Sequence, residues 1–116
     1  MAIWAALFPG FAHRTVARPV DRIDFRVNSD AGSSQQNHPR IAVSADGSFV
    51  IVWVDWRSGS PDIYLQWFDE HGLPVGTNRA VNDNTAYQFS PAVAVDHSGF
   101  YSTVFTDYRA HGYPFN

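Results

Sequence analysis

An acid and an arginine flank a tryptophan at Asp55, Trp56 and Arg57, where an apolar run ends. This group suits a sugar site, because a ring can stack on a sugar face while charged groups bond its hydroxyls. It also suits a structural joint, in which the carboxylate accepts backbone N–H groups and the arginine reaches an adjacent blade or a carbonyl. The residue types alone leave both interpretations open.

The same arrangement recurs 52 residues later as Asp107, Tyr108 and Arg109. Residues two apart in a strand point to one face, so each acid should lie beside its arginine, with the aromatic opposite. A motif that recurs in every unit of a repeat is what packing between units requires. We therefore expect structural joints, and we keep all six residues as candidate ligand-binding residues under the glycan alternative.

Oxygen-bearing side chains cluster at Asn28, Asp30, Asn82, Asp83 and Asn84. Such oxygens can hold Ca²⁺, but the sequence has no Asp-x-Asp-x-Asp-Gly loop, and turn formation explains Asn and Asp equally well. We expect no metal site and no other cofactor, with Ca²⁺ as the one alternative.

The histidines lack the spacing of metal ligands on one element. Each lies near an expected loop or turn, so we expect surface histidines at His13, His38, His71, His97 and His111.

Catalytic signatures are equally weak. The chain has no nucleophile elbow and no glycine-rich phosphate loop. Its single glutamate, Glu70, falls in an expected turn. A glycosidase pair would have to come from aspartates such as Asp55 and Asp62, whose separation the sequence does not give. We therefore name no catalytic residue and expect no enzyme activity.

The composition excludes several partners. The net charge is −3 and every base is an arginine, so no basic stripe is present to neutralise phosphates, and we expect no nucleic acid partner. The absence of cysteine excludes a disulfide scaffold and cysteine-bound zinc. No run reaches the roughly 18 apolar residues of a membrane-spanning helix. With 45% hydrophobic and 16% aromatic residues, the chain has ample material for a core.

These residues must be positioned by strands. From residue 23 onward, short apolar or alternating runs are separated by turn signals at 45–48 and 69–72. Connections this short join antiparallel neighbours, so the sequence predicts an antiparallel meander without helices. The expected strands are IDFRVN, RIAVS, FVIVWV and DIYLQWF.

One run, FVIVWV, is apolar at six consecutive positions. In a sheet with one solvent-exposed face, apolar and polar residues alternate along each strand. This run therefore predicts a strand covered on both faces. The equivalent FYSTVFT carries Ser102 and Thr103 where the first has Val50 and Ile51. We expect either that the second strand is less covered or that it borders a missing neighbour.

The chain matches itself at a shift of 52 residues. The matched pairs are Pro39 with Pro91, Ile41-Ala42-Val43 with Val93-Ala94-Val95, Gly47 with Gly99, Val52 with Val104, Trp53 with Phe105, and the two joints. Val27-Asn28 matches Val81-Asn82 at a shift of 54. A period near 50 residues made of strands predicts an array of four-stranded units.

The ends of the chain fit this plan incompletely. Residues 1–22 are expected to be an apolar arm, MAIWAALFPGFA, and a connector; a signal remnant is the alternative for residues 1–17. Residues 23–82 should hold an outer strand and a first complete unit, and residues 83–116 a partial second unit.

Residues 38–82 resemble the repeats of exported bacterial β-propellers, both the TolB-like kind and surface-protein repeats of that style. The resemblance rests on a proline, an Asp-Gly turn between two strands, Asp-x-Arg-x-Gly and Asp-Ile-Tyr, and residues 90–112 carry part of it again. It implies an all-β fold of propeller-type repeats, here about two four-stranded antiparallel blades in an incomplete ring. It also implies an extracellular, cell-surface or periplasmic location in a bacterium.

Fold alone does not fix function, since propellers serve many unrelated functions. We expect a noncatalytic binding or scaffold module of an exported or cell-surface bacterial protein, either a fragment of a longer propeller or a unit that oligomerises. Its partners are other blades or copies of itself, with glycans as the candidate ligand. The alternatives are part of a propeller enzyme acting on glycans, of sialidase or glycosidase type, and a two-blade lectin that oligomerises.

Overall fold

The structure is a computed structural model that describes residues 1–6, 24–82 and 86–109. Its elements are eight strands: β1 (Trp4–Ala6), β2 (Asp24–Arg26), β3 (Gln36–Val43), β4 (Phe49–Asp55), β5 (Asp62–Phe68), β6 (Pro74–Ala80), β7 (Gln88–Val95) and β8 (Tyr101–Asp107). The described residues contain no helix, so none of them forms a helical membrane span. The expectation of an all-β chain is confirmed.

Strands β3 to β6 form one four-stranded antiparallel sheet in sequence order, as the meander pattern predicts. Short β-turns set its register: in the first, Gly47 N donates to Ser44 O at 3.0 Å. Gly47 has a φ of +89°, which glycine adopts without strain. The turns expected at 45–48 and 69–72 are both present.

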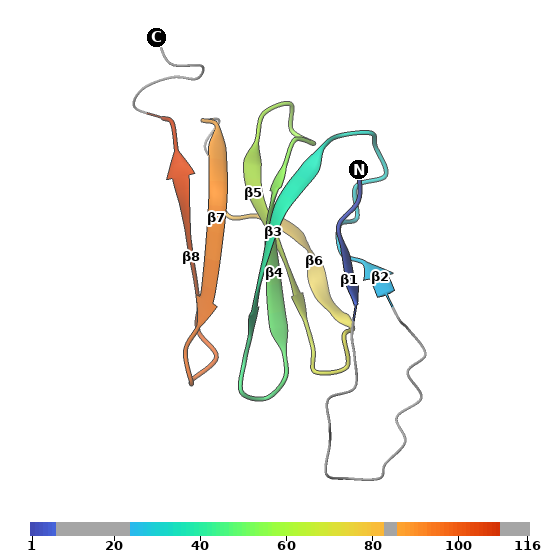
Figure 1. Ribbon diagram of the computed structural model, residues 1–116, viewed down its shortest axis with the longest axis vertical. Helices are drawn as coiled ribbons and strands as arrows, with labels where there is room; N and C mark the ends of the chain where they lie inside the picture. Colours follow the sequence, from blue (N-terminus) through green and yellow to red (C-terminus); the bar gives the residue numbers. More distant parts are fainter. Residues whose placement is uncertain (7–23, 83–85, 110–116) are drawn as a thin grey trace.

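The described strands form three stacked layers (Figure 1). The small sheet β1–β2 and the hairpin β7–β8 lie on opposite sides of β3–β6. Strand β4 is therefore buried at every position, which confirms the expectation drawn from FVIVWV.

The two faces of β4 contribute to two different cores. Phe49, Ile51 and Trp53 pack with Ile3 and Phe25 of the β1–β2 sheet. Burying each such side chain contributes about 1.5 to 3 kcal/mol. The intervening valines form the second core.

Val50, Val52 and Val54 pack against the β7–β8 hairpin, with Phe89 and Phe105 among their contacts. The far face of β8 has no such cover among the described residues, and burial alternates along this strand. Ser102 and Thr106 are exposed there, which confirms that the second unit is less covered than the first.

The match at a shift of 52 extends to the backbone. A register irregularity separates Asn37 from Arg40 in β3, and an equivalent one separates Phe89 from Ala92 in β7. Each irregularity contains a non-glycine residue with positive φ, His38 at 53° and Ser90 at 55°. Such a φ is rare outside glycine, so its recurrence at matched positions indicates one backbone plan used twice.

The start of the chain belongs to the same plan. The expected apolar arm is a strand over Trp4–Ala6 that pairs antiparallel with β2. Val27 N donates to Ile3 O at 2.8 Å, and Val81 N donates to Ile63 O at 2.8 Å. The sheet β1–β2 thus repeats the pairing of β5 with β6. The alternatives for residues 7–17, and the connector, lie outside the described residues.

Candidate functional site

The candidate site begins at Asp55, the last residue of β4, whose side chain is fully buried. Its Oδ1 accepts the backbone N–H of Arg57 at 2.9 Å. Its Oδ2 accepts the indole Nε1–H of Trp53 at 2.8 Å and a guanidinium N–H of Arg57 at 2.6 Å. A buried carboxylate is stable only when its charge and lone pairs are satisfied, and these three donors do so.

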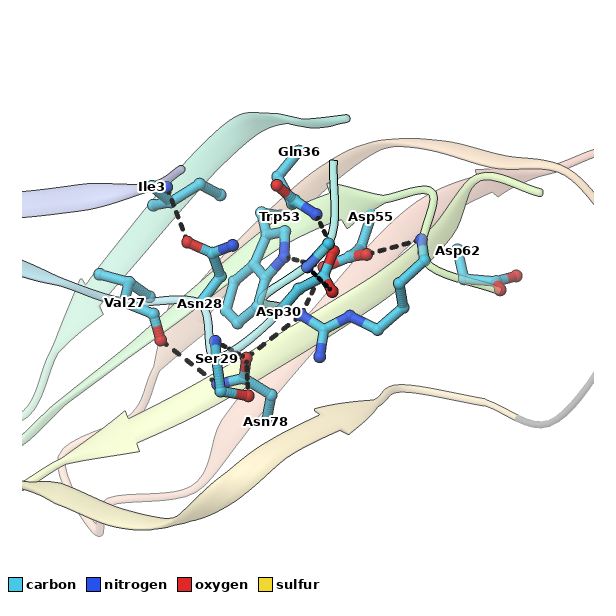
Figure 2. A network of polar contacts seen from close by, with 12 residues as sticks. Ile3, Val27, Asn28, Ser29, Asp30, Gln36, Trp53, Asp55, Asp62 and Asn78 are labelled. Atoms are coloured by element: carbon cyan, nitrogen blue, oxygen red, sulfur yellow. Dashed lines mark hydrogen bonds and ion pairs between the residues drawn. The ribbon is translucent and has the colours of Figure 1, made fainter. Parts of the chain in front are cut away.

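Figure 2 shows that this joint continues into a wider polar network. The guanidinium Nη2 of Arg57 also donates to Asn78 Oδ1 on β6 at 3.2 Å. Asn78 Oδ1 accepts the Ser29 N–H at 2.6 Å, and Asn78 Nδ2 donates to Val27 O at 3.3 Å. Arg57 therefore connects with the preceding layer through Asn78 rather than by a direct bond.

The guanidinium carbon of Arg57 lies 4.4 Å from the centroid of the Tyr64 ring, a cation–π arrangement. Burial acts to raise the pKa of Asp55, but the hydrogen bonds from Arg57 and Trp53 and the arginine charge outweigh it and leave that pKa below its usual value. Burial acts to lower the pKa of Arg57, and Asp55 more than compensates. Asp55 is thus held ionised as part of a structural pair.

The second joint has the same geometry. Asp107 Oδ1 accepts the backbone N–H of Arg109 at 2.8 Å, and Asp107 Oδ2 accepts its guanidinium at 2.7 Å. Phe105 replaces Trp53, so no indole N–H is available in this unit. The Arg109 side chain is 64% exposed against 21% for Arg57, because no described segment covers it on that side.

The two aromatics of the motif face away from their acid–arginine pairs, as expected from strand alternation. Trp56 contacts Tyr87 and Phe89 of the second unit at ring-centroid distances of 6.3 Å each. Tyr108 meets Phe89 edge-on at 5.9 Å. These contacts link four rings in the order Tyr87, Trp56, Phe89 and Tyr108, which we call the row of rings.

The indole Nε1 of Trp56 is one of several buried side-chain nitrogen and oxygen atoms that make no hydrogen bond to a described residue. A buried donor without a partner costs about 1 to 3 kcal/mol, and its burial keeps it out of contact with a ligand on the surface. The structure brings Asp55 together with Arg57, and Asp107 with Arg109; it does not bring the two joints together, since they belong to successive layers.

The oxygens considered for Ca²⁺ bond the protein itself. Asn28 Oδ1 accepts Ile3 N–H at 2.9 Å, and Asp30 Oδ2 accepts the Gln36 amide at 2.9 Å. Asn82 Oδ1 accepts the Gln88 amide at 2.7 Å. Asp83 and Asn84 lie outside the described residues. In the described part of the chain, no group of three or more His, Asp or Glu residues could hold a metal ion.

Three histidines, His38, His71 and His97, are exposed as expected. His13 and His111 lie outside the residues that the structure describes.

Sequence reasoning missed the buried glutamines. Gln36 and Gln88 are almost fully buried and begin β3 and β7. In the strand register they lie opposite Asp55 and Asp107. Gln88 also accepts the backbone N–H of Ile63 at 3.2 Å. Both glutamines fall at the shift of 52, which was the available signal.

Comparison of the chain with protein-family models, with curated proteins and with solved structures gave no match.

Proposed function

We propose that this chain is a noncatalytic β-propeller-type module that serves as a binding or scaffold unit of an exported or cell-surface bacterial protein. The observation that carries the proposal is the repeated joint: two sheets at a shift of 52 residues, each ending in the same acid–arginine pair. Blades packed face to face around an axis have this arrangement, since their inner strands are covered on both faces without helices.

The chemistry of the joint supports a structural rather than a catalytic role. Asp55 has its two oxygens occupied by three donors, and its pKa is lowered, which is unfavourable for general acid catalysis at neutral pH. The resemblance of residues 38–82 to exported propeller repeats supports an extracellular, cell-surface or periplasmic location.

The row of rings formed by Trp56, Tyr87, Phe89 and Tyr108 supports glycans as the ligand class. Aromatic ring faces suit the apolar faces of sugars, and Tyr87 and Tyr108 carry phenol hydroxyl groups as polar atoms on the same set of rings. This is the part of the proposal that a binding experiment tests.

The test is a glycan array with the full chain and with the variants Trp56→Phe and Tyr108→Ala. Tyr108→Ala removes one stacking ring, so glycan binding that depends on these rings should fall about tenfold, whereas Trp56→Phe keeps a ring and should reduce binding less. Phe100→Ala is the matched control, because Phe100 is an exposed aromatic in the turn at the opposite end of the hairpin. Loss of binding in the control alone, or no glycan binding at all, would remove the glycan assignment.

A further inference from the structure

We propose that molecules of this chain complete one another's blades. The outer edge of β8 in one molecule pairs with β1 of the next molecule. The inference rests on the blade interpretation given above and goes beyond it by naming the partner as a second copy of this chain. The two surfaces lie at opposite ends of the stack, so the contact is head-to-tail, and the rotation between successive blades of a propeller closes it into a ring.

The first support is that β1–β2 is the outer half of a unit. Trp4 pairs with Arg26 as Tyr64 pairs with Ala80. Together with the equivalent bonds from Val27 and Val81, this pairing places β1 at a shift of 60 from β5, and β2 at 54 from β6.

The second support is that β7–β8 is the inner half of a unit. It repeats β3–β4 at a shift of 52, with the same register and the same irregularity. In the complete sheet, β4 pairs with β5 along its whole length. Among the described residues β8 pairs with β7 only, and no described strand lies along its other edge, where a strand of another molecule can pair.

The two halves define one register for their union. Val52 pairs with Leu65 in the complete sheet, and applying the two shifts pairs Val104 of one molecule with Ala5 of the next. In the same way, Trp53 opposite Tyr64 becomes Phe105 opposite Trp4. The shifts of 52 and 60 therefore define a single pairing register between β8 of one molecule and β1 of the next.

The union also covers apolar side chains that are otherwise exposed. Ile41 and Val43 on β3 are 55% and 56% exposed, because β1–β2 covers only the other half of that face. Val104 on β8 is 67% exposed. In the joined register, β7–β8 of one molecule lies over β3 of the next and brings these surfaces together. One contact therefore buries both patches.

Charges agree with the same placement. In the complete unit, Arg57 lies over Tyr64 and donates to Asn78. At the shift of 60, the residue equivalent to Tyr64 is Trp4, which is 59% exposed. At the shift of 54, the residue equivalent to Asn78 is Asp24, which carries a carboxylate. Arg109 of one molecule, while still paired with Asp107, then lies over Trp4 and beside Asp24 of the next. Within one molecule, Arg57 donates to the neutral amide of Asn78. Between molecules, Arg109 meets the negative carboxylate of Asp24, and this opposite charge favours a second copy of the chain as the partner.

The strands of the described residues amount to two four-stranded blades. Propellers close with about four to eight blades, so a ring formed by this 116-residue chain in solution should contain about two to four molecules.

The first experiment is multi-angle light scattering on the full chain, with Val104→Asp as the test variant. We expect one species of roughly two to four times the 13.0 kDa chain mass, and dissociation to the monomer in Val104→Asp. The control is Val75→Asp, since Val75 is 53% exposed on β6, outside the proposed contact. It should keep the assembled mass.

The second experiment tests the register, for which the absence of cysteine gives a clean background. Ala5→Cys is mixed with Val104→Cys and oxidised mildly, and a covalent dimer is expected because paired Cα atoms in a ladder lie within disulfide reach. Thr103→Cys mixed with Ala5→Cys is the control. Residue 103 is one position away and points to the opposite face, so this mixture should stay uncrosslinked.

A monomeric chain would overturn the inference, as would an assembly that crosslinks through residue 103 or through neither pair. A monomer that still binds glycans would end this inference and leave the proposed function standing. A correctly crosslinked ring that binds no glycan would support this inference and remove only the glycan assignment from the proposed function.

Discussion

Asp55 connects three features of the first unit: the indole of Trp53, the turn after β4 and the guanidinium of Arg57. The sequence predicted that the acid and its arginine share a face, because alternation in a strand depends only on spacing. It did not predict the indole bond or the link through Asn78, because these depend on which side chains the neighbouring strands bring close. The same limit applies to the ring contacts of Trp56.

Replacing the buried acid should destabilise the fold strongly. Asp55→Asn removes the counter-charge of a largely buried arginine, and we expect the free energy of unfolding to fall by about 2 to 4 kcal/mol. Urea unfolding at a fixed chain concentration measures this. Asp46→Asn makes the same change at an exposed turn acid and should cost much less. Equal losses in the two variants would contradict a structural role for Asp55.

The lowered pKa of Asp55 predicts a pH dependence. A carboxyl group whose pKa is lower folded than unfolded adds stability above its unfolded pKa, about 4, and this contribution is lost as the pH falls through the folded pKa. Urea midpoints measured from pH 6 down to pH 2 should therefore drop steeply below about pH 4. The slope should be shallower in Asp55→Asn. An unchanged slope would show that other acids dominate.

At the scale of elements, the strand order and the covered β4 follow from the sequence because apolar runs and Asp-Gly turns are local signals. The irregularities at His38 and Ser90 do not, since neither residue type announces a positive φ. The role of β1 was also only partly predictable: three residues carry too little pattern to show that they repeat β5.

The positive φ at Ser90 gives a backbone test. Ser90→Gly should raise the free energy of unfolding by about 0.5 to 1 kcal/mol, because glycine adopts this conformation without strain. Ser102→Gly, in the regular part of β8, should lower it by a similar amount, about 0.5 to 1 kcal/mol. Thermal unfolding of both variants measures the difference. If both variants lowered the free energy of unfolding, Ser90 would have the negative φ of an ordinary strand residue.

At the scale of the whole molecule, the described chain is a stack of a half unit, a complete unit and a second half unit, with β1–β2 at one side and β8 at the other (Figure 1). The repeat was visible in the sequence, because both joints and several strand residues recur at one shift. The stacking itself brings Val52 and Val54 against Phe89 and Phe105, residues far apart along the chain. Every proposal made above depends on that contact.

Nuclear Overhauser spectroscopy on valine-methyl-labelled protein tests the contact directly. We expect cross-peaks from the methyl groups of Val52 and Val54 to the ring protons of Phe89 and Phe105. Valine methyl groups that contact protons of β3 to β6 alone, with none from β7 or β8, would contradict it.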